Sequence, residues 1–508
     1  MDVPKLDFNV TFPKVSYKQD KTSVDVRYPL ILPYANAHIY WDSKLGEIIY
    51  DLEEPLLTAE DQENLNKLHT AIQEMININV SHDDTKETME EYLHKIATLV
   101  ISETQIKMTE GGYYRVFYYL YRDFYGLNEI EALMHDAFIE DIQCNGVGQP
   151  IYIVHRVFRN MRTAIQFDDV DKLASFVEKV AQKCGKYISY ASPLLDGSLP
   201  DGSRVNATYT KDVSSRGPTF TIRKFTKIPF TPLDLIKFGT LSPEMLAFLW
   251  IMMQYKLNVL IAGGTGSGKT TLLNAVAFFI PPEARVVSIE DTRELNLSRE
   301  NWLPSVVRAG ITSGGVGEVD MFSLLRASFR QIPDYVIVGE VRGKEAAVLF
   351  QGMASGHASM ATIHADSVET VIRRLETPPI ELPPTLVNEL DAVVVMTHAV
   401  VNSRETRKLR EIIEVISVLA DGTAKTNTPF MWDPGKDKFY FKKDSRVFEK
   451  IEKKIGISVE KLSIDFDKRV KLIYELYKRQ FNDFEALQKL INDFYKNPEA
   501  VYVKFGIQ

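Results

Sequence analysis

The stretch Gly263-Gly264-Thr265-Gly266-Ser267-Gly268-Lys269-Thr270 decides the fold of this chain. It matches the pattern G-x-x-x-x-G-K-[ST], in which glycines let the backbone turn tightly, so that its N–H groups converge on phosphate oxygens. In this pattern the ammonium group, here that of Lys269, reaches the β- and γ-phosphates, and the next hydroxyl, here that of Thr270, can ligate Mg²⁺. The stretch therefore predicts a phosphate-binding loop (P-loop).

The flanking residues support this prediction. The apolar run Asn258-Val259-Leu260-Ile261-Ala262 is typical of a buried strand, and the run from Thr271 to Val276 is typical of a helix. A helix that starts directly after the loop would turn its N-terminus toward the bound anion. The nucleotide-binding residues that we expect are Gly264, Thr265, Gly266, Ser267, Gly268, Lys269, Thr270 and Thr271.

Length and composition limit the classes of protein to consider. At 508 residues the chain is too long for one core, so two or three domains are expected. The formal net charge of −8 gives no overall basic field that would favour nucleic acid. Cys144 and Cys184 form no CxxC pair and no zinc pattern, and we expect both to be small core residues in a reducing, cytosolic setting.

Neither a signal peptide nor a membrane-spanning helix is expected. The N-terminus has no apolar segment of the signal-peptide kind. The longest apolar candidate, residues 247–253, is far shorter than the ~20 residues that a spanning helix needs. Any action at a membrane would therefore be peripheral.

The pattern along the chain predicts several parts. In residues 241–420 strands alternate with helices, which is typical of a largely parallel sheet wrapped by helices. Prolines and a glycine between 227 and 240 indicate a linker. The parts that we expect are a mostly helical region at 1–112, an α+β domain at 113–226, the linker at 227–240, the P-loop domain at 241–420, and a C-terminal hairpin and helical extension at 421–508.

Three further motifs follow the P-loop in order. The first is an apolar strand that ends in Glu290 and Asp291, with Glu294 beyond it. In the second, the strand Tyr335-Val336-Ile337-Val338-Gly339 leads to Glu340. The third is a strand that ends at His364.

These side chains have the chemistry that phosphoryl transfer to water needs. A metal ion must neutralise phosphate charge, a water must be oriented or deprotonated in line, and positive groups must stabilise the γ-phosphoryl oxygens. Open α/β sheets bind their ligands at the carboxyl ends of the strands, where these side chains are expected. Glu340 resembles the acid of a Walker B motif, with Glu in place of the usual Asp.

The four motifs resemble the Walker A, Asp box, aberrant Walker B and His box of the type II/IV secretion ATPases. That superfamily powers type IV pili, type II and type IV secretion, and the archaeal swimming filament. The resemblance covers roughly residues 120–420, and segments at 141–146 and 199–206 resemble the domain that precedes the ATPase core. The chain lacks the tetracysteine zinc element of bacterial type II members. Its N-terminal and C-terminal regions look more like archaeal members, with the archaellum ATPase first and an archaeal adhesive pilus ATPase as the alternative.

The resemblance implies a fold, a partner set and a role for each site residue. It implies a RecA-like ATPase core that binds ATP and Mg²⁺, and a homohexamer at the cytosolic face of the membrane, in contact with lipid and with a polytopic platform protein. Lys269 and Thr270 would hold phosphate and Mg²⁺, Glu290 would be the general base or water-positioning carboxylate, and Glu340 would ligate Mg²⁺. His364 would sense the γ-phosphate, and Arg204 and Arg223 would reach the nucleotide from the preceding domain.

Two other function classes remain to be weighed. A nucleic-acid motor, such as a helicase or a DNA-packaging ATPase, is disfavoured by the acidic balance and by the lack of an aromatic-plus-basic motif, so no nucleic acid is expected as a partner. A regulatory nucleotide switch with negligible turnover is disfavoured by the full set of carboxylates at strand ends. Phosphate release in the presence of lipid or DNA would separate the three classes.

Overall fold

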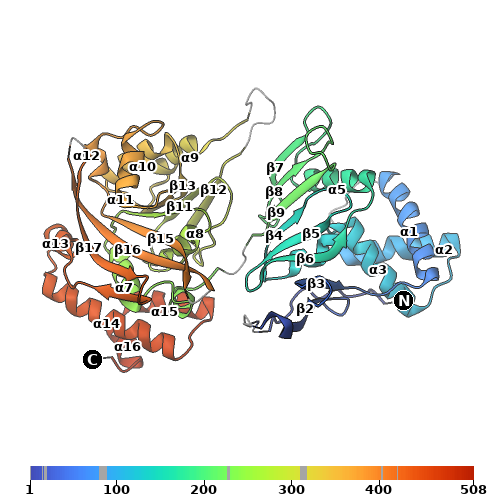
Figure 1. The fold of residues 1–508 in the computed structure, drawn as a ribbon, viewed down its shortest axis with the longest axis horizontal. Coiled ribbons are helices and arrows are strands. Elements are labelled where there is room, and N and C mark those ends of the chain that lie inside the picture. The colour runs from blue at the N-terminus through green and yellow to red at the C-terminus, as the bar shows by residue number, and fades with distance from the viewer. Residues whose placement is uncertain are drawn as a thin grey trace. The chain divides into compact units, whose positions relative to one another are not determined.

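The computed structural model describes residues 2–13, 15, 20–78, 88–225, 229–308, 317–401, 404–419 and 422–507. The chain divides into two compact units, residues 1–225 and 226–508. Figure 1 shows helices and a sheet in each unit.

The described residues of the first unit form a nine-stranded sheet with the order β1-β2-β3-β6-β5-β4-β9-β8-β7. All neighbouring strands are antiparallel except β3 and β6, which pair in parallel through Ile49 with Arg162 and Tyr50 with Thr163. The strands are β1 Asp25–Ile31, β2 Ala35–Asp42, β3 Glu47–Glu53, β4 Ile139–Cys144, β5 Pro150–His155, β6 Arg159–Gln166, β7 Leu194–Ser198, β8 Arg204–Thr208 and β9 Thr219–Arg223.

The helices of the first unit share one hydrophobic core with this sheet. The core joins Ile39 of β2, Leu68 of α1 and Phe117 of α3, so the predicted boundary between 112 and 113 falls within one packed unit. The strands β1–β3 belong to the sheet because β3 pairs with β6, which lies more than a hundred residues later in the chain. The helices are η1 Lys21–Ser23, α1 Ala59–Ile78, α2 Met89–Thr104, α3 Glu110–Phe124, η2 Asn128–Ile130, α4 Glu131–His135 and α5 Val170–Lys183.

The second unit is built on another nine-stranded sheet, counted over the described residues, with the order β12-β11-β13-β14-β10-β15-β16-β17-β18. The strands from β12 to β15 in this order run parallel, and β16, β17 and β18 follow antiparallel. The strands are β10 Val259–Gly263, β11 Val286–Glu290, β12 Trp302–Val306, β13 Tyr335–Val341, β14 Ala358–Ile363, β15 Ala392–Val401, β16 Arg404–Val418, β17 Ala424–Asp433 and β18 Lys438–Phe441.

Helices cover both faces of this sheet, as Figure 1 shows. Along β10 the side chains of Val259 and Ile261 join one hydrophobic cluster, and those of Leu260 and Ala262 join the other. Successive side chains of a strand point to opposite faces, and a parallel sheet is buried on both. The predicted α/β class with a RecA-like core is therefore confirmed.

The helices of the second unit begin in the region predicted as a linker. Residues 226–228 lie outside the described part, and within 229–240 the segment Pro232–Lys237 forms α6. Its start is stabilised by a capping box between Thr231 and Asp234. The helices are α6, α7 Pro243–Gln254, α8 Lys269–Ala277, α9 Met321–Ser328, η3 Phe329–Gln331, α10 Glu345–Ala354, α11 Val368–Glu376, α12 Pro384–Val387, α13 Arg446–Ile455, α14 Val459–Lys478, α15 Phe484–Lys496 and α16 Pro498–Lys504.

The C-terminal residues complete the second unit. β17 pairs with β16, and β18 closes a hairpin with β17 in the region where the sequence predicts one. The helices that follow pack their apolar side chains into the cluster that also holds α7 and α8. Within the described residues, no helix combines the length and the apolar character needed to cross a bilayer.

A buried arginine joins α14 to α7. Arg469 is 1% exposed, and its guanidinium donates to Asp465 Oδ2 at 3.0 Å and also to Gln254 Oε1. It lies over the rings of Trp250, at 4.9 Å, and Phe494, at 5.0 Å. A buried charge is tolerated only where ion pairs, hydrogen bonds and ring faces replace water.

We predict that Arg469→Ala destabilises the second unit by about 3 kcal/mol, because the change leaves Asp465 and Gln254 without their donor and opens a cavity. Urea unfolding followed by tryptophan fluorescence measures the effect. Arg479→Ala is the matched control, because that guanidinium is exposed and lies over the ring of Phe505. Equal unfolding midpoints for the two variants would contradict the prediction.

Candidate active site

The predicted site residues of the second unit gather at one edge of its sheet. β10, β14, β13 and β11 are successive parallel strands, so their carboxyl ends meet at the same edge. The P-loop follows β10, His364 follows β14, Glu340 is the next-to-last residue of β13, and Glu290 is the last residue of β11. Four segments that are far apart in the chain are thereby brought together.

The shape of the P-loop depends on glycine. Gly266 and Gly268 have φ angles of +69° and +92°, which side chains rarely tolerate. A Cβ on Gly263 would overlap Ser267 Oγ and lie 2.8 Å from the carbonyl oxygen of Met396 on β15. The loop is therefore a tight turn that packs against a neighbouring strand and leads directly into α8.

Lys269 is the cation of the P-loop. Its Nζ donates to the carbonyl oxygens of Gly263 and Gly264, at 3.0 Å each. Partial burial lowers the pKa of Lys269, whereas the charges of Glu340 and Glu294 raise it. Both carboxylates therefore act electrostatically on Lys269.

Glu290 is a buried carboxyl group. It is 1% exposed, and its Oε1 accepts from the backbone N–H groups of Glu294 and Leu295, at 2.9 Å each. Its Oε2 is buried and has no hydrogen-bond partner among the described residues. Burial raises the pKa of Glu290 to about 7, so this group can take up or release a proton near neutral pH.

Gly339 makes room for this carboxyl group. A Cβ on Gly339 would lie 3.2 Å from Glu290 Cγ, tighter than an ordinary contact. The carbonyl oxygen of Gly339 accepts from Thr362 Oγ1 at 2.6 Å, which ties β13 to β14. His364, two residues after Thr362, is exposed at the strand end.

Glu340 and Thr270 fit a magnesium ion. Glu340 Oε2 accepts from Arg342 Nε at 2.9 Å, and the Thr270 hydroxyl belongs to the first turn of α8. Carboxylate and hydroxyl oxygens are hard ligands, and Mg²⁺ usually takes one or two protein ligands beside nucleotide phosphates and water. Among the described residues, no group of three or more acidic, histidine or cysteine side chains forms a separate metal site.

Two residues near the P-loop were given no role by the sequence prediction of the site, although Glu294 was noted in a motif. Glu294 lies in a loop that is bonded to α8, because Asn274 Nδ2 donates to its carbonyl oxygen at 3.3 Å and Asn274 Oδ1 accepts from Asn296 N at 3.1 Å. The sequence signal is Asn274 itself, a buried amide in an otherwise apolar helix segment. Arg407, on β16, donates from Nε to the carbonyl oxygen of Gly266 at 2.9 Å, and no local pattern indicates this contact.

Arg204 and Arg223 belong to the first unit. They are direct cross-strand partners on β8 and β9. Arg204 Nη2 lies 3.1 Å from Asp196 Oδ2, and Arg223 Nε lies 3.2 Å from Asp141 Oδ1. The structure thus brings the two predicted arginines together and pairs each with a carboxylate.

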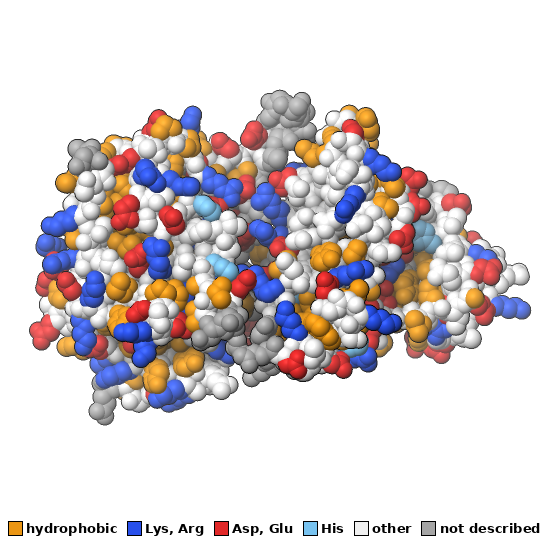
Figure 2. All heavy atoms as spheres, viewed as in Figure 1, with side chains coloured by type: hydrophobic (Ala, Val, Ile, Leu, Met, Phe, Trp, Pro, Cys, Tyr) orange, Lys and Arg blue, Asp and Glu red, His pale blue; other side chains and the backbone are white. Residues whose placement is uncertain are grey.

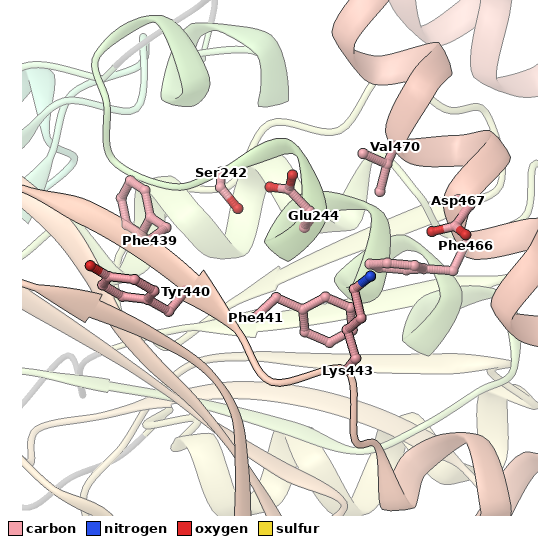
Figure 3. A pocket seen from close by; sticks show the side chains of 9 residues that line it. All are labelled: Ser242, Glu244, Phe439, Tyr440, Phe441, Lys443, Phe466, Asp467 and Val470. Atoms are coloured by element: carbon pink, nitrogen blue, oxygen red, sulfur yellow. The ribbon is translucent and has the colours of Figure 1, made fainter.

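The second unit also contains a hollow of about 310 Å³ at a different place. Figure 3 shows that its lining comes from the start of α7, from the end of the β17–β18 hairpin and from α14. The rings of Phe439, Tyr440, Phe441 and Phe466 contribute much of the wall. None of the predicted nucleotide-binding residues lines it, so it is not assigned to the nucleotide.

This chain is similar to known proteins over different parts of its length. The family model of the type II/IV secretion system protein matches residues 126–424. An uncharacterized protein of Methanocaldococcus jannaschii is 32% identical over 503 residues, which cover 93% of this chain and 90% of the relative. The type IV secretion system protein PtlH of Bordetella pertussis is 34% identical over 227 residues, which cover 41% of this chain and 67% of PtlH. The solved VirB11 ATPase of Brucella suis is 25% identical, with a TM-score of 0.29, over 55% of this chain and 89% of VirB11.

The raised pKa of Glu290 generates a pH prediction. A general base must be deprotonated, so turnover of ATP should rise with pH through about 7 and fall at pH 6 to about a tenth of its plateau. Because burial disfavours the ionised carboxylate, the folded state favours the protonated form of Glu290. The stability that this protonated group contributes is present at low pH and is lost as the pH rises through 7. Steady-state kcat between pH 5.5 and 8.5 tests this, and a flat profile would exclude Glu290 as the titrating base.

Proposed function

Since the chain belongs to the type II/IV secretion ATPase family, we propose that it is a Mg²⁺-dependent ATPase motor, in which a homohexamer powers the assembly or rotation of an archaeal type IV pilus-like filament or archaellum. The ATPase activity follows from the family. The hexamer, the filament and the metal are the finer parts of the proposal.

The observation that carries the proposal is the convergence at one sheet edge. A P-loop on β10 stands beside His364 after β14, Glu340 on β13 and Glu290 on β11. These are the groups that phosphate binding, charge neutralisation and activation of water require. A protein that only bound nucleotide would need the loop but not the carboxylates.

We assign the steps of hydrolysis to residues of this chain. The P-loop N–H groups and Lys269 bind the phosphates, and Glu290 accepts the proton of the attacking water. A bound Mg²⁺, held by Thr270 and Glu340, would neutralise charge on the β- and γ-phosphates. His364 would contact the γ-phosphate, and Arg204 and Arg223 are proposed as further cations for the nucleotide.

Two observations disfavour a motor that acts on nucleic acid. The net charge is −8, and Figure 2 shows acidic and basic side chains interspersed over the visible face. From the family we also propose peripheral contact with lipid at the cytoplasmic face of the membrane and a polytopic platform protein as partner. The competing function is a nucleic-acid translocating ATPase.

We predict that Lys269→Ala abolishes ATP hydrolysis and strongly weakens nucleotide binding, because the ammonium group contacts the β- and γ-phosphates. Phosphate release by the purified variant is the measurement. Lys256→Ala is a suitable control, because that lysine precedes β10 and its charge pairs with Asp334. Turnover of the Lys269 variant at the wild-type rate would refute the nucleotide site.

We predict that anionic phospholipid vesicles raise the ATPase rate and that single-stranded or double-stranded DNA does not. Light scattering should find a hexamer in at least one of the nucleotide-free, ADP and ATP-analogue states. Stimulation by DNA alone would favour the nucleic-acid motor, and a monomer in all three states would contradict the ring.

A further inference from the structure

The β15–β16 hairpin extends past the end of β10 and stands beside the P-loop. β10 pairs with β15 only as far as Gly263 with Met396. Beyond Met396, β15 continues to Val401 and pairs with β16, where His398 faces Arg407. The part of the hairpin that follows Met396 therefore lies at the same edge of the sheet as the nucleotide-binding residues.

Arg407 of this hairpin reaches the outer turn of the P-loop. Its Nε donates to the carbonyl oxygen of Gly266 at 2.9 Å. A Cβ on Gly268 would lie 3.3 Å from Arg407 Cδ, so the aliphatic part of the arginine packs where this glycine has no side chain. The guanidinium is thus held against the loop by one hydrogen bond and one close contact.

Three carbonyl oxygens of the P-loop accept hydrogen bonds from cationic side chains. The carbonyl oxygens of Gly263 and Gly264 accept from Lys269, and that of Gly266 accepts from Arg407. Two cations therefore bind carbonyl oxygens of the loop, whereas the N–H groups of a P-loop are the donors that bind an anion. Within the described residues, the Nη groups of Arg407 donate no hydrogen bond to protein.

The neighbouring residue keeps this arginine in place. Lys408 is 3% exposed, and its Nζ donates to the carbonyl oxygen of Gly239 at 2.9 Å and pairs with Asp437 at 2.7 Å. It also lies over the rings of Trp432 and Phe439. Because the backbone at Lys408 is anchored on several sides, Arg407 is presented from a rigid strand, as a preorganised binding group should be.

We propose that Arg407 is a polyphosphate-binding residue of the ATP site, which braces the outer turn of the P-loop through Nε and contacts the nucleotide phosphates through its Nη groups. This inference rests on the proposed function. An arginine suits the role because its charge is permanent and its fork of donors can bind a carbonyl and a phosphate oxygen at once. The alternative is a purely structural brace.

The two roles are separated by three substitutions of Arg407, with ADP binding measured by calorimetry. We expect Arg407→Ala to lower the affinity for ADP at least ~10-fold, as the loss of a hydrogen bond to a charged group does. Arg407→Gln should be as weak as the alanine variant, because it keeps a donor for Gly266 but no charge. Arg407→Lys should bind with intermediate affinity. Restoration of wild-type affinity by glutamine, or no loss in the alanine variant, would overturn the proposal.

Two further variants complete the experiment. Arg446→Ala, which removes an exposed guanidinium paired with Glu449 on α13, should leave ADP affinity unchanged. Lys269→Ala reports on the proposed function itself. If the Lys269 variant loses affinity for ADP and the Arg407 variants keep it, only the proposed role of Arg407 is refuted. If every variant keeps the wild-type affinity for ADP, the proposed nucleotide site is refuted together with the role of Arg407.

Discussion

The parallel pairing of β11, β13, β14 and β10 is the constraint on which the site depends. Parallel strands place all their carboxyl ends at one edge of the sheet. Residues that follow different strands, and that are distant in sequence, therefore lie close together there. The two apolar clusters, one on each face, hold this sheet in place. The chemistry at the edge is therefore supported by the largest buried surfaces of the second unit.

At this edge the charges are arranged by burial as much as by pairing. Glu290 is withdrawn from water and bonded to the loop that carries Glu294, whereas Glu340 is partly exposed and paired with Arg342. The two environments give the carboxyl groups different properties: burial lets Glu290 exchange a proton near neutral pH, whereas Glu340 is hydrogen-bonded to the guanidinium of Arg342. This difference supports the assignment of Glu290 to the water and Glu340 to the metal.

The sequence predicted the features that depend on residues close together in the chain, and it did not predict the contacts between residues that are far apart. The P-loop and the strands before Glu290 and Glu340 were predicted correctly because a strand, a glycine turn and a helix leave a pattern within about twenty residues. The contact of Arg407 with Gly266 joins residues 141 positions apart, and the pairing of β3 with β6 joins residues 113 apart. Such contacts depend on the packed sheet, so no window of sequence contains them.

The assignment of Glu290 as the proton acceptor is tested most directly by comparing Glu290→Gln with Glu294→Gln in ATP binding and in single-turnover hydrolysis. We expect the Glu290 variant to bind ATP nearly as the wild type does and to hydrolyse it at least ~10²-fold more slowly, while the Glu294 variant keeps most of its turnover. Turnover that is lost in the Glu294 variant and kept in the Glu290 variant would contradict it, and would move the base to the loop carboxylate.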